Sequence, residues 1–339
     1  MVELTDIYEE SLMLFQVFIL LISLVTLVWS ADKFVFGASS LARNIGVSPM
    51  IIGLTIVAMG SSAPEMMVAA SASFQGNSNT GIGNAIGSNI TNIALVLGIT
   101  ALLQPLKVSS STVKREIPLI LIISVIAYIM LFDSHFSFIE GAILITGFFI
   151  YIFALLAITL RRTQGKPIDD PMILEAEADV PESVSLTSSI FWLTLGMALL
   201  PISANYLVDS SVFIAKFYGI SDLVIGLTII AIGTSLPELA ASVVSIYKKE
   251  DDLALGNIIG SNIFNILAVL SLTGLIAPGD IDSYAATRDA PYMLGVTGLL
   301  FILCFSRKFG YFRITRLKGA LLLVSFIAYQ YILFSEVKG

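Results

Sequence analysis

The chain has 339 residues, of which 56% are hydrophobic and only 13% are charged, and its formal net charge is −7. With a mean hydropathy of +0.92, this composition excludes an ordinary soluble domain and indicates a protein that crosses the bilayer several times. A single cysteine and a single histidine exclude an internal disulfide and leave little room for a zinc site. Metal chemistry must therefore come from oxygen ligands, and no cofactor is expected.

Apolar segments long enough to cross about 30 Å of hydrocarbon recur along the whole chain. No cleavable signal peptide is expected before them, because residues 1–11 hold four acids and no lysine or arginine. The pattern predicts an all-α membrane protein with ten transmembrane helices, near residues 12–29, 44–72, 81–103, 117–132, 138–160, 188–209, 221–247, 253–276, 290–306 and 315–334.

The basic residues are distributed unevenly between alternate connections of these helices. Fifteen lysines and arginines fall on one side of the membrane and three on the other. Because cytoplasmic loops carry the excess of basic residues, we expect a multi-pass protein of the cell (inner) membrane with both termini outside. The polar, acidic segment 161–187 then reads as a cytoplasmic linker.

The chain also repeats itself at an offset of 173 residues. GLTIVAMGSSAPE (53–65) matches GLTIIAIGTSLPE (226–238) at 9 of 13 positions, and GNAIGSNITNI (84–94) matches GNIIGSNIFNI (257–267) at 9 of 11. Each half holds five predicted helices, and because five is odd the second copy enters the membrane from the opposite side. The sequence therefore predicts two inverted-topology five-helix repeats, 1–160 and 188–339, which is typical of secondary transporters.

A proline followed by a glutamate stands inside one apolar run of each repeat, as Pro64–Glu65 and Pro237–Glu238. Proline has no amide hydrogen and its ring crowds the carbonyl four residues back, so each helix is predicted to break near the glycine at that position. Carbonyls freed at membrane depth need protein, water or an ion to satisfy them. Since intramembrane acids usually mark ion pathways, a purely structural, protonated role for the two glutamates is the less favoured reading.

The second motif of each repeat adds neutral oxygens. Ser88 and Asn92 are four residues apart, as are Ser261 and Asn265, so each pair shares one helical face. If the two copies meet at the membrane centre, they form an all-oxygen pocket with two carboxylates. Calcium binds six to eight such ligands, so the pocket predicts a site for calcium and for sodium.

These paired motifs resemble the sodium/calcium exchanger family of the cation/calcium exchanger superfamily, whose alpha repeats carry G-[ST]-S-x-P-E and G-N-x-x-G-S-N. The resemblance covers motifs 53–65, 83–94, 226–238 and 256–267, and is closest to the short prokaryotic members. It implies transport of calcium against sodium by alternating access. The first helices of the repeats, 12–29 and 188–209, would move across the others.

The resemblance also implies roles for individual residues. Glu65 and Glu238 would be the central calcium ligands, helped by the backbone carbonyls of Ser61 and Thr234. Sodium sites would flank them, one built from Ala58, Ser61, Ser62, Ser88 and Glu238, the other from Ala231, Thr234, Ser235, Ser261 and Glu65. Asn92 and Asn265 would line the middle of the pocket.

Two positions depart from the pattern of the family. Asn265 stands where some relatives, including the potassium-dependent exchangers, have aspartate, which argues against a potassium requirement. Ser61 stands where many members have threonine, which keeps the hydroxyl but loosens its rotamer.

We therefore expect a calcium/sodium antiporter that binds these two ions and the lipid bilayer, works as a monomer and has no nucleic-acid partner. A proton/calcium antiporter that uses the same two glutamates is the closest alternative, and a calcium-binding channel or sensor is the next. An intramembrane hydrolase is disfavoured, because the one histidine, His135, lies in a predicted external loop and no aspartate lies at the centre of a span.

Overall fold

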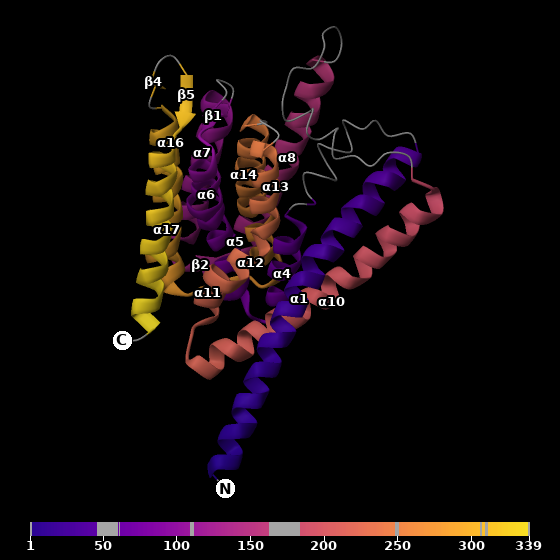
Figure 1. Cartoon of the computed structure of the whole chain (residues 1–339), viewed down its shortest axis with the longest axis vertical. Helices are drawn as coiled ribbons and strands as arrows, with labels where there is room; N and C mark the ends of the chain where they lie inside the picture. Colours follow the sequence, from indigo (N-terminus) through magenta and orange to yellow (C-terminus); the bar gives the residue numbers. More distant parts are fainter. Residues whose placement is uncertain are drawn as a thin grey trace.

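A computed structural model describes residues 2–45, 60, 62–108, 112–162, 184–247, 251–305, 307–308 and 311–337. The described part is mostly helical, and its helices form one bundle with two long helices set obliquely against it (Figure 1). Five short strands lie at the ends of this bundle and supplement the predicted all-α fold.

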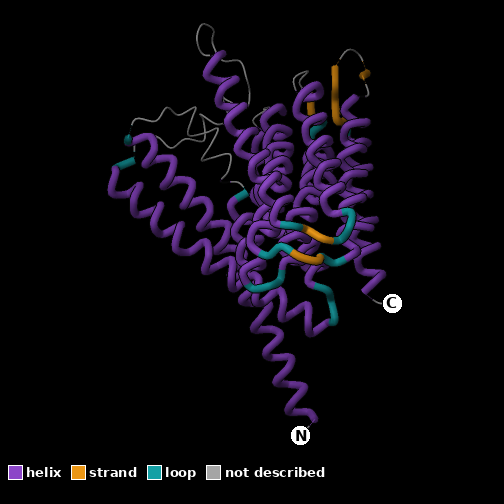
Figure 2. Tube along the Cα trace, turned by 180° about the vertical axis from the view of Figure 1, so that it is seen from behind, coloured by secondary structure: helices purple, strands orange, loops and turns teal. Residues whose placement is uncertain are grey.

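The two oblique helices are α1 (Val2–Asn44) and α10 (Leu186–Tyr218), and they lie side by side (Figures 1 and 2). Glycines allow this close approach, because a Cβ atom at Gly196 would lie 2.5 Å from the backbone nitrogen of Phe34. The rings of Trp29 and Trp192 meet edge to face with centroids 6.2 Å apart. Both helices extend beyond the predicted spans 12–29 and 188–209.

The first group of bundle elements follows α1 along the chain. Polar residues and glycines lie between elements such as the first two of this group. Its members are α4 (Ala63–Phe74), α5 (Ser78–Ile90), the π-helical turn η2 (Thr91–Val96), α6 (Leu97–Leu103), β1 (Leu106–Val108), η3 (Thr112–Glu116), α7 (Ile117–Leu131), β2 (His135–Phe136) and α8 (Phe138–Arg162).

The second group follows α10 and has a closely similar order of elements. Its members are α11 (Asp222–Ile225), η4 (Gly226–Ile230), α12 (Ala231–Thr234), α13 (Leu236–Tyr247), α14 (Asp251–Phe264), η5 (Asn265–Leu270), α15 (Ser271–Ile276), β3 (Gly279–Asp280), η6 (Ala285–Asp289), α16 (Ala290–Phe305), β4 (Arg307–Lys308), β5 (Tyr311–Ile314) and α17 (Arg316–Val337). The bounds of α4 and α13, and those of η3 and η6, differ by the 173 residues that separate the sequence motifs.

The strands connect the two halves of the chain at opposite ends of the bundle. At one end β1, β5 and β4 form an antiparallel sheet in which Lys107 pairs with Arg313. At the other end β2 pairs with β3, and His135 lies opposite Asp280. Both pairings join residues more than 140 positions apart, so no local sequence pattern announces them.

Seven of the described helical segments are long and apolar enough to cross a membrane: Leu12–Asn44, Ser78–Leu103, Phe138–Ala157, Leu186–Tyr218, Asp222–Tyr247, Ala254–Ile276 and Arg316–Ser335. The predicted spans 117–132 and 290–306 are the helices α7 and α16, of 15 and 16 residues. Most of the predicted span 44–72 falls on residues outside the described part.

The burial pattern suits a bilayer. Large apolar side chains such as Leu14, Phe153 and Val324 are exposed, whereas serines, threonines and asparagines lie inside the bundle. Because lipid is as apolar as these side chains, an outward-facing leucine carries no penalty, and the buried polar groups mark the interior as the functional region.

Candidate ion-binding site

Each proline-glutamate motif lies in the first turn of a helix that follows a non-helical serine. Ser62 and Ser235 have backbone angles close to φ −90°, ψ 5° (−93°, 9° and −86°, 2°), outside the regular helix. Pro64 and Pro237 then occupy the first turns of α4 and α13. In the second copy the break lies two residues beyond the predicted glycine, because proline is tolerated in the first turn of a helix, where its missing N–H leaves no bond unmade.

The two glutamates are deeply buried. Glu65 is 0% exposed and Glu238 is 1% exposed, and their carboxylates are close enough to interact electrostatically. Ser261 Oγ donates a hydrogen bond of 3.2 Å to Glu238 Oε1, which joins the two motifs of the second repeat, whereas the resemblance places Ser261 in a sodium site with Glu65. Two buried acids in one region require cations or protons to balance them.

Asn84 links the two repeats within the site, and the sequence reasoning did not select it. Its Nδ2 donates to the backbone oxygen of Glu65 at 3.2 Å. Its Oδ1 accepts from Thr234 Oγ1 at 3.3 Å and from Ser88 Oγ at 3.5 Å. The repeated Gly-Asn that opens the second motif was the available signal, since its counterpart is Asn257.

A close crossing of α5 with the segment before the second break makes this link possible. A Cβ atom at Gly83 would lie 2.5 Å from the carbonyl oxygen of Leu223, and one at Gly87 would lie 2.7 Å from the Cα atom of Leu227. These glycines therefore let the backbones touch and place α5 beside η4 and α12.

Several buried polar side-chain atoms of the repeated motifs have no hydrogen-bond partner among the described residues. Such atoms are costly to bury unless something else coordinates them. They are both carboxylate oxygens of Glu65, Oε2 of Glu238, the hydroxyls of Ser62 and Ser235, and the side-chain amide groups of Asn92 and Asn265. The donor set of hard oxygens fits calcium or sodium as transported ions.

Asn92 and Asn265 lie on the π-helical turns η2 and η5, one in each repeat. Both are buried, at 0% and 1% exposure. A π-turn inserts an extra residue into a helix and is frequent at functional sites. The wider turn gives the side chains at these positions a direction that a regular helix lacks.

The remaining predicted ligands have mixed outcomes. Ala58 and Ser61 lie outside the described residues. The carbonyl of Ala231 is not left free by the break, since it accepts the amide of Ser235 at 3.1 Å, although a second lone pair remains. Within the described residues no group of three or more histidines, cysteines or acids is placed to hold a metal, so the site combines two acids with neutral oxygens.

A pocket of about 660 Å³ adjoins the two breaks and is mostly apolar. One wall is α1, from Leu24 to Val35, and the other includes Pro64 and Pro237. The pocket therefore lies between part of the oblique helix α1 and the two breaks, although Leu24 and Val35 of α1 also pack closely against Gly233 and Gly60.

A family model described as sodium/calcium exchanger protein matches residues 15–157 and 188–335. The chain belongs to the sodium/calcium exchanger family. One relative is CaxA of Alkalimonas amylolytica, which is named as an antiporter. It is 54% identical to this chain, over 96% of this chain and 100% of its own. The sodium/calcium exchanger MaX1 of Methanosarcina acetivorans is 33% identical over 93% of this chain and 97% of its own.

The solved structures give the same family. A structure of the sodium-calcium exchanger NCX_Mj, soaked with sodium and strontium, matches with a TM-score of 0.60 and 31% identity. The match covers 93% of this chain and 98% of that one. This member of the sodium/calcium exchanger family is therefore a membrane transport protein.

Proposed function

We propose that the protein exchanges calcium for sodium across the cell membrane by alternating access, without a need for potassium. The observation that carries the proposal is the set of buried side-chain oxygens without hydrogen-bond partners in the repeated motifs, which includes both carboxylate oxygens of Glu65 and Oε2 of Glu238. An empty site of this kind is unfavourable because burial and mutual repulsion penalise two carboxylates. If the site can change from one side of the membrane to the other only with ions bound, the protein exchanges ions and does not let them leak.

In this proposal Glu65 and Glu238 bind calcium together with the carbonyls of Ser61 and Thr234. The hydroxyls of Ser62, Ser88, Ser235 and Ser261, with the carbonyls of Ala58 and Ala231, serve sodium, and Asn92 and Asn265 line the centre. The Asn84 link supports this arrangement, because it joins the first-repeat helix α5 to Thr234 and to the backbone of Glu65.

The architecture we propose has ten transmembrane helices in two inverted repeats, 1–160 and 188–339, with the cytoplasmic linker 161–187 between them and both termini outside. The helices α1 and α10 would slide together over the bundle. Their close packing against each other and the apolar pocket between α1 and the breaks support this movement.

A test of the coupling ion uses the full chain in proteoliposomes loaded with sodium and diluted into a medium that contains calcium. An outward sodium gradient should drive calcium uptake, potassium should have no effect, and Glu65→Gln and Glu238→Gln should each abolish uptake. Ser137→Ala is a control, because Ser137 lies away from the site. Its hydroxyl donates to Glu140 Oε2 at 2.7 Å.

Uptake driven by a pH gradient and indifferent to sodium would refute the sodium proposal in favour of proton/calcium exchange, for which the same two acids are suited. Calcium binding without countertransport would point to a channel or a sensor. Uptake that needs potassium would contradict the interpretation of Asn265.

A further inference from the structure

Two basic side chains lie directly opposite each other in the three-stranded sheet. Lys107 of β1 is the register partner of Arg313 of β5. Residues paired in this way on antiparallel strands project from the same face, with Cβ atoms about 5 Å apart. Their neighbours Leu106 and Ile314 are fully buried, so Lys107 and Arg313 occupy the outer, exposed face of the sheet.

Such a pair of like charges is unfavourable unless an anion lies between them. Among the described residues, neither side chain has a salt-bridge partner. The acid Asp251 lies beside β1, where it accepts from the backbone amide of Lys107 at 3.0 Å and from Gln104 Nε2 at 3.4 Å. Its carboxylate therefore binds the backbone of β1, and the Lys107 and Arg313 side chains are exposed with no ion pair to a described acid.

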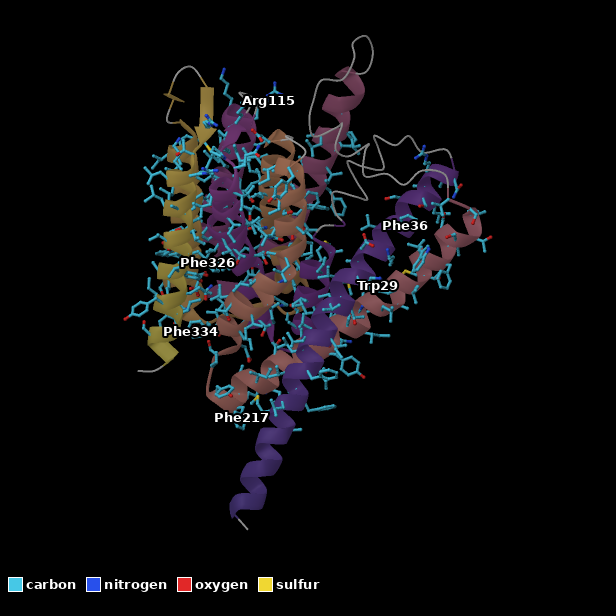
Figure 3. All side chains as sticks on the ribbon, viewed as in Figure 1. Trp29, Phe36, Arg115, Phe217, Phe326 and Phe334 are labelled. Atoms are coloured by element: carbon cyan, nitrogen blue, oxygen red, sulfur yellow. The ribbon has the colours of Figure 1, made fainter. Side chains whose placement is uncertain are left out.

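Further cations surround this pair at the same end of the bundle. Lys114 and Arg115 of η3 are exposed, and Figure 3 shows Arg115 at the end that carries the sheet. Arg316, at the start of α17, is also exposed and donates to the carbonyls of Leu102 and Leu103 at 3.0 and 3.2 Å. Glu116, beside Arg115, is the one acid of η3.

Exposed apolar side chains lie next to these basic residues along the chain. Leu317 is 73% exposed, Leu321 is 48% exposed and Leu103 is 46% exposed. Exposed leucines beside exposed cations mark the boundary between the headgroup layer and the hydrocarbon of a bilayer. A soluble anion or an acidic peptide would use the cations alone, whereas a phospholipid uses both parts of the surface.

We propose that Lys107 and Arg313 bind the headgroup phosphate of an anionic phospholipid whose acyl chains lie along Leu317 and Leu321. The lipid phosphate supplies the charge that the Lys107–Arg313 pair lacks, and it ties β1 of the first half to β5 of the second. The site is separate from the ion-binding residues, so it stands whichever ion the protein exchanges.

Binding of phosphatidylglycerol to the full-length protein in detergent, followed by native mass spectrometry, tests the proposal. The double variant Lys107→Gln/Arg313→Gln should bind phosphatidylglycerol about 30-fold more weakly, which corresponds to about 1 kcal/mol for each basic side chain. Binding of phosphatidylcholine should not change. Lys216→Gln, which removes an exposed base on α10 far along the chain from the sheet, is the matched control and should bind like the parent.

A charge reversal keeps the test independent of folding defects. Lys107→Glu places an acid opposite Arg313, so the variant should no longer bind phosphatidylglycerol. Because the two opposed side chains then attract each other, its unfolding temperature in phosphatidylcholine should be no lower than that of the parent. Equal phosphatidylglycerol affinity in the parent and the double variant would overturn the proposal, as would equal competition by inorganic phosphate. A variant in which the acids of 161–187 are neutralised is a further test. If it binds phosphatidylglycerol more tightly than the parent by a similar factor, the proposal is also overturned, because that segment then occupies the basic pair.

Discussion

Gly83→Ala should disable the protein through a single methyl group. The new Cβ atom would lie 2.5 Å from the carbonyl oxygen of Leu223, 3.1 Å from the backbone nitrogen of Leu227 and 3.2 Å from the Cα atom of Gly226. All three are backbone atoms that no rotamer change moves aside. Normal carbon contacts begin near 3.5 Å, so α5 must retreat from η4 by about 1 Å.

That retreat acts on the site through the next residue. The hydrogen bond from Thr234 to Asn84 is already 3.3 Å long, and a further ångström breaks it. Overpacking of this kind costs about 1–3 kcal/mol, and a displacement of about 1 Å in a preorganised site can cost on the order of 100-fold in rate. We expect calcium uptake to fall at least about tenfold, with a lower unfolding temperature.

Gly147→Ala supplies the matched control for this experiment. It makes the same substitution inside α8, where the nearest atom to the new Cβ would be Leu267 Cδ2 at an ordinary 3.5 Å. Alanine in a helix interior is favoured over glycine by about 1 kcal/mol, so this variant should unfold at or above the parent temperature and transport normally. Parent-like uptake by Gly83→Ala, measured in the same proteoliposomes, would refute the argument.

Three other predictions concern separate parts of the chain. Pro64→Ala should slow transport in vesicles without abolishing it, because alanine partly restores the helix that the proline interrupts. Asp280→Asn should lower the pKa of His135, which the hydrogen bond to Asp280 Oδ1 at 2.8 Å raises above its ordinary value; the charged pair is present at low pH and is lost as pH rises through that raised pKa. Since His135 is the one histidine of the chain, a single ¹⁵N-histidine NMR titration measures the change, and an unaltered titration would contradict the pairing. Tyr329→Phe should destabilise by about 1–3 kcal/mol, because it removes the 2.9 Å bond from Tyr329 Oη to the buried Asp289; thermal unfolding should report this loss, while an unchanged unfolding temperature would show that the bond contributes nothing.

The sequence predicts much of this fold because membrane helices are governed by simple rules. The long apolar segments predict the helices. Proline followed by glutamate predicts the breaks, which lie at Ser62 and Ser235, to within a few residues. The span 12–29 was too short, however, because Asp32 and Lys33 look like the end of a helix. In the structure they pair at 2.7 Å, with Lys33 Nζ 5.5 Å from the centre of the Trp192 ring. These contacts let α1 continue to Asn44.

The site was predictable in its residue types but not in its connections. Repetition predicts Glu65 and Glu238 as ligands, but the bond from Ser261 to Glu238 joins Ser261 to the glutamate other than the one with which the resemblance groups it. Asn84 escaped notice because its role depends on which helix α5 touches, and that contact is set by the fit of Gly83 against a segment about 140 residues away. Local sequence does not encode such a distant fit.

The length of α1 and α10 has a consequence for movement within the bilayer. Their membrane-crossing segments have 33 residues each, and at 1.5 Å per residue each is about 50 Å long against about 30 Å of hydrocarbon. A helix longer than the hydrocarbon is thick is accommodated by tilting, and both helices lie obliquely against the bundle (Figure 1). A tilted helix with surplus length can move along its own axis by one turn and still present apolar side chains to the acyl chains. Its backbone hydrogen bonds lie within the helix at every depth, apart from the one that Pro201 removes from α10, so the membrane itself opposes such a translation only weakly.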